Sequence, residues 1–297
     1  MIELRTDIRI GFVGLGVMGD PMAGHILAAG YPLTVYNRTP AKTERLRKLG
    51  ATAAVDLPSL AAESDVIFTM LPSSADVEMV AIGADGLLES LRPGSLIVDM
   101  STISPIATRH IGETLAARDV GMLDAPVSGG DVGAIEGTLS IMVGGTLEHF
   151  HRALPLFRTM GGTIVHVGPA GSGQLTKAAN QIVVGIMLAA LAEAIVLAER
   201  GGVAAERLLD VLRGGLAANQ CMEVKRQKYL TRTFDPGGRS ELHLKDLGIA
   251  LDVAREIGVV LPHTALLEQL FQAMKQKGWG AEDHAGILWV IEELSES

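Results

Sequence analysis

A lysine and an asparagine near the middle of the chain are candidates for chemistry because they would share one helix face. In GPAGSGQLTKAANQ, residues 168–181, Lys177 and Asn180 are three positions apart, the spacing of neighbours on a helix surface. An apolar helical stretch follows, and burying an ammonium there costs free energy. Lys177 therefore either has a function or lays its methylene stem along an apolar surface.

A second candidate segment is LDAPVSGG, residues 123–130, which ends in Ser128, Gly129 and Gly130 just after a predicted strand. A hydroxyl and successive backbone N–H groups in this arrangement favour an anion, so the segment could receive a carboxylate. Ser128 lies outside any G-x-S-x-G motif, which argues against a serine hydrolase. The segment is therefore a candidate anion-binding loop.

A glycine-rich turn near the start predicts a nucleotide site. Gly14, Gly16 and Gly19 form G-x-G-x-x-G directly after an apolar strand and before a helix, and a second strand, LTVYN, follows. Such glycines allow a tight turn and close approach of a pyrophosphate to the backbone, and the helix N-terminus supplies N–H groups and a positive dipole. The context favours a dinucleotide-binding βαβ unit from Ile8 to about Thr39 over an incidental glycine-rich turn.

The end of the second predicted strand indicates which dinucleotide binds. An NAD site would place Asp or Glu there to bind the ribose 2′-hydroxyl, but the sequence reads Asn37-Arg38-Thr39 and has no acidic residue between Asp20 and Glu44. Arg38 and Lys42 would suit a 2′-phosphate. We predict NADP(H), with NAD(H) as the alternative cofactor. If these basic residues bind no phosphate, they are simply the solvated basic start of a helix.

Short apolar runs must form the framework that positions these residues. They alternate with helical stretches through the first half, as a mainly parallel sheet covered by helices requires: IRIGFVG, LTVYN, DVIFTM, SLIVDM, GMLDAPV, LSIMVGG and TIVHVG. After residue 175 only helical patterns occur. We predict the α/β fold class, with an N-terminal Rossmann-type doubly wound sheet over residues 1–169 and an all-α domain over residues 170–297.

The helical domain opens with an unusually apolar stretch, Ile182 to Ala198. It is short for a membrane span of ~20 residues and carries Glu193, so we expect a buried core helix. A helix that is apolar on nearly all faces must be covered on every side. A domain of this size can hardly cover it alone, so we predict a homodimer or homotetramer in which another subunit covers part of it.

Composition excludes several classes of protein. The chain has 297 residues, of which 48% are hydrophobic and 20% charged, and a net charge of -9, which argues against nucleic acid as a partner. Cys221 is the only cysteine, so no disulfide can form within the chain. Glu3 and Arg5 lie where a signal peptide would need its apolar run. We therefore expect a cytoplasmic protein. The eight histidines show no metal-ligand spacing, and no metal is expected.

The ordered motifs together resemble the β-hydroxyacid dehydrogenase family over nearly the whole chain. This family includes 3-hydroxyisobutyrate dehydrogenase and semialdehyde reductases and, more remotely, 6-phosphogluconate dehydrogenase. The matching pieces are GFVGLGVMGDPMA (11–23), MLP (70–72), DMST (99–102), DAPVSGG (124–130), GSGQLTKAANQ (171–181) and LKDL (244–247).

The resemblance implies a role for each matching residue. Lys177 would be the catalytic acid or base and Asn180 would orient the substrate hydroxyl. Ser128, Gly129 and Gly130 would hold a carboxylate, Lys245 would reach both cofactor and substrate, and Asp246 would cap or pair locally. The expected cofactor-binding residues are Gly14, Leu15, Gly16, Val17, Met18, Gly19, Asn37, Arg38, Thr39, Lys42, Met70, Leu71, Pro72, Thr102 and Lys245.

Within the family, the runs RGGLA (213–217) and LHLKDLGIALD (242–252) are most similar to the tartronate semialdehyde reductase branch. The resemblance therefore implies reduction of a small semialdehyde to its hydroxy acid, and Asn37-Arg38-Thr39 adds the predicted preference for NADPH. Asn37-Arg38 departs from the acidic residue that this branch often carries, which leaves cofactor and substrate open. The alternatives are 3-hydroxyisobutyrate dehydrogenase, a glyoxylate or succinic semialdehyde reductase and, from another class, a non-catalytic NADP-binding sensor.

Overall fold

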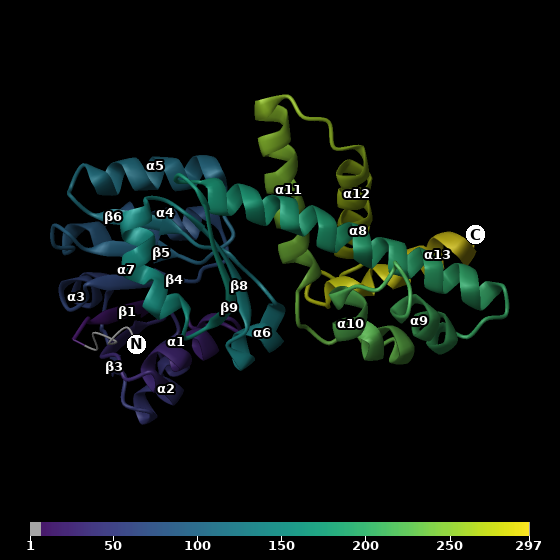
Figure 1. Cartoon of the computed structure of the whole chain (residues 1–297), viewed down its shortest axis with the longest axis horizontal. Coiled ribbons are helices and arrows are strands. Elements are labelled where there is room, and N and C mark those ends of the chain that lie inside the picture. The colour runs from purple at the N-terminus through teal and green to yellow at the C-terminus, as the bar shows by residue number, and fades with distance from the viewer. Residues whose placement is uncertain (1–6, 297) are drawn as a thin grey trace. The chain divides into compact units, whose positions relative to one another are not determined.

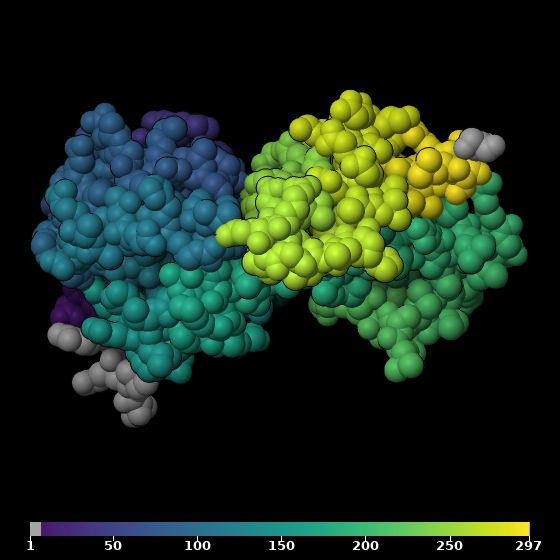
Figure 2. Space-filling view, turned by 90° about the horizontal axis from the view of Figure 1, so that it is seen from above, coloured from purple at the N-terminus to yellow at the C-terminus, as the bar shows by residue number. Residues whose placement is uncertain are grey.

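The computed structural model describes residues 7–296, so Glu3 and Arg5 lie outside the described residues. The chain divides into two compact units, Met1–Lys177 and Ala178–Ser297. Figure 1 traces the elements of both units, and Figure 2 shows their surfaces, purple to teal for the first and green to yellow for the second.

The first unit is built on one sheet. Within residues 7–296, nine strands pair in the order β3-β2-β1-β4-β5-β6-β8-β7, with β9 beside β8. All pairs are parallel except β8 with β6 and with β7. The strands are β1 (Ile10–Val13), β2 (Leu33–Tyr36), β3 (Thr52–Ala53), β4 (Val66–Thr69), β5 (Leu96–Asp99), β6 (Gly121–Asp124), β7 (Val127–Ser128), β8 (Leu139–Gly144) and β9 (Gly161–Gly168).

Helices cover both faces of this sheet. Successive side chains of a strand point to opposite faces, and each face packs against its own set of helices. In β4, Phe68 belongs to a cluster with α1, α6 and α7, whereas Ile67 belongs to a cluster with α3, α4 and α5. This two-sided burial confirms the predicted doubly wound fold. The helices are α1 (Gly19–Ala28), α2 (Glu44–Lys48), α3 (Leu57–Ala62), α4 (Ser74–Ile82), α5 (Pro105–Ala116), α6 (Gly130–Glu136) and α7 (Leu147–Phe157).

The second unit consists of helices around its own apolar core, as predicted. Gly258, with φ +72°, ends α11 in the left-handed conformation, and Pro262 starts α12 where a missing N–H costs nothing. The helices are α8 (Ser172–Arg200), which begins in the first unit, α9 (Ala205–Arg213), α10 (Gln220–Thr231), α11 (Ser240–Ile257), α12 (Pro262–Gln276) and α13 (Ile287–Glu296).

Helix α8 is the apolar helix predicted from the sequence. It has 29 residues and would be long and apolar enough to cross a membrane, a test that the core helix of a soluble protein also passes. Leu188, Leu191 and Ile195 are buried in the core of the second unit. On another face, Val183 and Leu197 are 56% and 76% exposed. One side of α8 is therefore a core face, and the other is apolar and is left exposed by residues 7–296.

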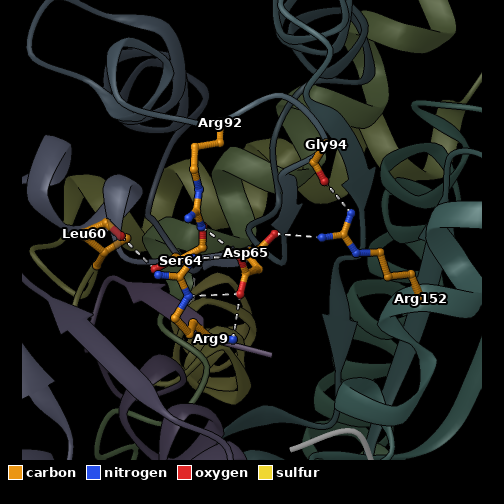
Figure 3. Close-up of polar contacts among 7 residues, drawn as sticks. All are labelled: Arg9, Leu60, Ser64, Asp65, Arg92, Gly94 and Arg152. Atoms are coloured by element: carbon orange, nitrogen blue, oxygen red, sulfur yellow. Dashed lines mark hydrogen bonds and ion pairs between the residues drawn. The ribbon is translucent and has the colours of Figure 1, made fainter. Parts of the chain in front are cut away.

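A cluster of charged groups ties together the amino ends of three strands (Figure 3). Asp65, just before β4, accepts hydrogen bonds at Oδ1 from the Nη2 atoms of Arg9 (3.0 Å) and Arg92 (2.8 Å). Arg152 of α7 donates to the backbone oxygens of Asp65 (3.0 Å) and Gly94 (2.6 Å). The cluster lies at the edge of the sheet opposite to the carboxyl ends, so its role is structural.

Replacing Asp65 by asparagine should lower the free energy of unfolding by about 1 kcal/mol at pH 7, since the charge-assisted bonds are partly exposed. Hydrogen bonds from Arg9 lower the pKa of Asp65. A lowered carboxyl pKa contributes stability above the unfolded-state pKa and loses it as the pH falls through the folded-state pKa. Urea unfolding should therefore show a smaller difference at pH 3 than at pH 7. Asp252→Asn, in an exposed pair with Arg255, is the control with little effect.

Candidate active site

The carboxyl ends of four neighbouring strands form a row in the first unit. Val13 of β1 is in register with Thr69 of β4, Thr69 with Asp99 of β5, and Asp99 with Asp124 of β6. Four predicted site segments follow these strand ends: the glycine turn, Met70 to Pro72, Thr102 and the segment leading to Ser128. Ligands of open parallel sheets bind at this edge.

The glycine turn fits a dinucleotide. Gly14 has φ +97°, and a Cβ there would lie 2.3 Å from the Met70 oxygen; a Cβ on Gly19 would lie 1.9 Å from the Gly14 oxygen. These two glycines are needed by the fold itself. A Cβ on Gly16, in contrast, would meet no atom within 4 Å, and a cavity of about 820 Å³ borders Gly16 and Val17. Gly16 thus leaves the open backbone that a pyrophosphate requires.

Asn37 connects the turn to the loop after β2. Its Oδ1 accepts a hydrogen bond from the Leu15 N–H (2.9 Å), and its Nδ2 donates to the Thr39 oxygen (3.0 Å). Asn37 therefore shapes the loop, and Leu15, whose side chain is buried in the core, supports the turn.

Basic side chains extend from the loop that Asn37 shapes. Arg38, Thr39 and Lys42 are exposed. Within residues 7–296, Arg38 and Lys42 form no ion pair, whereas Asp20 is paired with Arg45 at 2.6 Å. The two unpaired cations are available to an anion such as a phosphate.

The remaining predicted cofactor positions lie around the turn and the next strand ends. Val17 is 69% exposed at the turn, while Met18 and Met70 pack partly against the core. The Leu71 N–H donates to Ser101 Oγ (2.8 Å), which joins the loops after β4 and β5. Pro72 and Thr102 belong to these same two loops.

The start of α8 is fastened to the row of strand ends, and this fastening positions Lys177. The Asp124 carboxylate accepts hydrogen bonds from the N–H groups of Gly171 (2.8 Å) and Gln174 (2.9 Å). A Cβ on Gly173 would lie 2.4 Å from the Met142 oxygen, so the helix packs directly on the sheet. Lys177, one turn further on, is 7% exposed. The first unit thus holds a buried lysine close to its ligand-binding edge.

Gln174 adds a second fastening at the start of α8. Its Nε2 donates to the Ser101 oxygen (2.8 Å), and its Oε1 accepts from the Ile103 N–H (3.0 Å). The loop that contains Thr102 is therefore held against the helix that carries Lys177.

Two buried aspartates at this edge were not selected from the sequence. Burial raises the pKa of Asp124, and it raises that of Asp99 to about 6. Asp99 Oδ1 accepts from Thr69 Oγ1 (2.8 Å), while its Oδ2 has no hydrogen-bond partner among the described residues. An aspartate at the end of an apolar strand is the sequence signal that could have identified both.

The segment after β6 contains two successive glycines with positive φ. Ser128 ends β7, and Gly129 and Gly130 follow with φ of +138° and +65°. A Cβ on Gly130 would meet no atom within 4 Å. Successive glycines with positive φ leave backbone N–H groups accessible to a carboxylate.

Asn180 and LKDL belong to the second unit. Asn180 Nδ2 donates to Gln181 Oε1 (3.0 Å), and Gln181 Nε2 donates to Asp246 Oδ2 (2.8 Å). The Lys245 Nζ lies 3.2 Å from Asp246 Oδ1. Asp246 thus pairs locally, as predicted. Lys177 and Asn180 share α8 at the spacing that puts two residues on one face.

A doubly wound sheet with an open glycine turn and a lysine fastened at the same edge defines an NAD(P)-dependent dehydrogenase. Two family descriptions match the chain: the NAD binding domain of 6-phosphogluconate dehydrogenase over residues 9–168, and the NAD-binding domain of NADP-dependent 3-hydroxyisobutyrate dehydrogenase over residues 171–291. The chain belongs to the β-hydroxyacid dehydrogenase family and is an oxidoreductase that uses a pyridine nucleotide.

Relatives cover the chain almost completely. It is 40% identical to 2-hydroxy-3-oxopropionate reductase of Escherichia coli K12, over 97% of this chain and 98% of that protein. It is 36% identical to NAD-dependent L-serine dehydrogenase of Pseudomonas aeruginosa, over 93% and 95%. The structure of Mycobacterium tuberculosis 3-hydroxyisobutyrate dehydrogenase with L-serine aligns with a TM-score of 0.87 and 32% identity, over 96% of this chain and 99% of that one.

Proposed function

We propose that this protein reduces a small semialdehyde to its hydroxy acid with NADPH, and that tartronate semialdehyde is its substrate. The observation that carries the proposal is Lys177, buried next to the ligand-binding edge on a helix start that Asp124 fastens to β6. The 40% identity to a 2-hydroxy-3-oxopropionate reductase supports the choice of substrate, which is the same compound under another name.

In this proposal the residues of the chain bind, orient and protonate the substrate. The nicotinamide supplies the hydride when bound. The Lys177 ammonium donates a hydrogen bond to the aldehyde oxygen and transfers a proton to it as negative charge develops. In the oxidative direction the neutral amine removes the hydroxyl proton. The carboxylate binds to Ser128, Gly129 and Gly130.

Two residues of the second unit are also given roles in substrate and cofactor binding. Asn180, one helix turn after Lys177, orients the reacting hydroxyl. Lys245 is assigned to cofactor and substrate from the family motif LKDL. The preference for NADPH rests on Arg38, Thr39 and Lys42, which offer a 2′-phosphate one hydroxyl and two cations that form no ion pair within residues 7–296.

The test is NADPH oxidation with tartronate semialdehyde, methylmalonate semialdehyde, succinic semialdehyde and glyoxylate. We expect the highest kcat/KM with tartronate semialdehyde. A higher value with methylmalonate semialdehyde would make the protein a 3-hydroxyisobutyrate dehydrogenase, and a higher value with either of the others would make it a succinic semialdehyde or glyoxylate reductase. NADPH binding without turnover of any of them would favour a sensor.

The protein is further proposed to be a cytoplasmic homo-oligomer. Val183, Ala190 and Leu197 are exposed on α8 at intervals of seven residues, and a stripe of this kind suits a second copy of the chain. Light scattering after size exclusion should give a dimer or a tetramer, and Leu197→Glu should shift it to smaller species. A wild-type monomer would contradict the proposal. The single cysteine, Cys221, agrees with a reducing compartment.

A further inference from the structure

The side chain of Gln181 is held from two sides inside the second unit. Its Nε2 donates to Asp246 Oδ2 (2.8 Å), and its Oε1 accepts from Asn180 Nδ2 (3.0 Å). A carboxylate oxygen can only accept here, so the amide nitrogen of Gln181 must face Asp246 and its oxygen must face Asn180. The orientation of the Asn180 carboxamide is then fixed as well: its nitrogen is engaged, and Oδ1 is the atom that it can present to a substrate hydroxyl.

The backbone of Gln181 is held by a histidine from the same helix as Asp246. His243 Nε2 lies 3.1 Å from the Gln181 carbonyl oxygen. A carbonyl oxygen only accepts, so His243 Nε2 carries the hydrogen. His243 and Asp246 are three positions apart on α11, and together they grip the backbone and the side chain of one residue of α8.

The structure around His243 fits its ring closely. The ring stacks on Phe271, with centroids 4.8 Å apart, and its Nδ1 lies 3.1 Å from Nδ1 of His284, so one of these two nitrogens donates a hydrogen bond to the other. In α8, a Cβ on Gly185 would lie 2.6 Å from both His243 Nε2 and Leu267 Cδ2. The imidazole can therefore reach the Gln181 carbonyl only because residue 185 is glycine. A glycine inside a long helix lowers its stability, so this position has a packing reason.

We infer that His243 is a positioning residue for the reaction: with Asp246 it fixes Gln181, and through Gln181 it orients Asn180. The inference rests on the proposed function, because it assigns the reacting hydroxyl to Asn180. His243 does not touch the substrate in this account. Its loss should slow the chemical step by misorienting Asn180 while leaving the cofactor site of the first unit intact.

The test compares two substitutions at one position. His243→Phe keeps a flat ring against Phe271 but removes the donor, and His243→Gln restores an N–H donor of similar reach. With tartronate semialdehyde, we expect kcat to fall roughly 10-fold in His243→Phe and to recover to within about 3-fold in His243→Gln. The Kd of NADPH should stay within about 2-fold in both. Equal kcat values in wild type and His243→Phe would overturn the inference.

Gly185→Ala provides a second route to the same state, since its methyl group crowds the imidazole without altering it, although it also lies 2.6 Å from Leu267 Cδ2. Gly112→Ala is the matched control: it lies inside α5, and its Cβ would meet only the Met122 sulfur, at 3.7 Å. Gly185→Ala should lower kcat as His243→Phe does, and Gly112→Ala should leave kcat unchanged. A purely structural role would lower Tm in Gly185→Ala while the folded enzyme kept its kcat, and this result would also refute the inference.

Side-chain amide NMR separates this inference from the proposed function. The Asn180 Nδ2 resonances, assigned by their loss in Asn180→Asp, should shift in His243→Phe and return toward wild type in His243→Gln. This readout needs no turnover. If wild type reduces none of the aldehydes, the proposed function fails while the amide shift still decides the positioning. An unchanged Asn180 resonance in His243→Phe refutes the positioning whether or not the enzyme is active.

Discussion

Replacing Lys177 by methionine should lower kcat for semialdehyde reduction by at least ~10²-fold, as expected for the loss of a general acid. Methionine keeps the length and apolar character of a side chain that is 7% exposed, so the helix start fastened by Asp124 and Gln174 should keep its structure. The Kd of NADPH, measured by fluorescence titration, should change little, because the ammonium acts on the substrate oxygen. Steady-state kinetics with saturating NADPH measures kcat.

The neighbouring residue supplies a control for this substitution. Thr176 Oγ1 donates to the Ser172 oxygen within α8 (2.8 Å), so Thr176→Ala alters the same helix turn without removing a charge. Its turnover should stay close to wild type. A Lys177→Met enzyme with normal kcat would remove lysine from the mechanism, and equal losses in both variants would show that helix geometry, rather than the ammonium, was disturbed.

The fold could be predicted to a large extent because its signals are local. The central parallel strands are four-residue apolar runs that end at turn residues, and each predicted run overlaps a strand. The strand β3, Thr52–Ala53, has only two residues and leaves no pattern. The antiparallel pairing of β8 with β6 and β7 was not predicted, since the direction of a strand is set by its connections and not by its own residues.

The site residues that could be predicted are likewise those whose requirements are local in the sequence. The glycine turn was predictable because positive φ and close backbone contacts demand glycine locally. Asp124 and Gln174 were not, because their partners are 47 and 73 residues away along the chain. Asn37 illustrates the difference: it lies at the predicted place, yet its carboxamide binds the main chain, and only the structure could reveal that.

The start of α8 lies before its apolar run, as the prediction that Lys177 and Asn180 share a helix face requires. The apolar pattern begins at Ile182, whereas α8 begins at Ser172, ten residues earlier. Those ten residues are largely polar or small and have weak helical periodicity of their own. Their helical conformation is accompanied by tertiary hydrogen bonds to Asp124 and the Ser101–Ile103 loop. Tertiary contacts can determine where a helix begins when local propensity does not.

The second large effect is expected at the cofactor site. Arg38→Ala should weaken NADPH binding roughly 10- to 100-fold, the range expected for losing a charge-assisted hydrogen bond to a phosphate, and should leave NADH binding nearly unchanged. Arg38 is exposed beyond β2 and forms no ion pair within residues 7–296, so its removal breaks no internal contact of the described chain. The measurement is kcat/KM for both cofactors with one aldehyde substrate.

The control for Arg38→Ala is a second substitution that removes one positive charge from a nearby arginine. Arg47, on α2, is exposed and pairs with Glu44 at 3.0 Å. Arg47→Ala should alter NADPH and NADH to the same small extent, because a general change in charge is largely screened by salt. Equal losses for both cofactors in Arg38→Ala would remove the basis for NADPH preference. A wild-type enzyme that favours NADH would show that an unpaired arginine after β2 is not sufficient to select the phosphate.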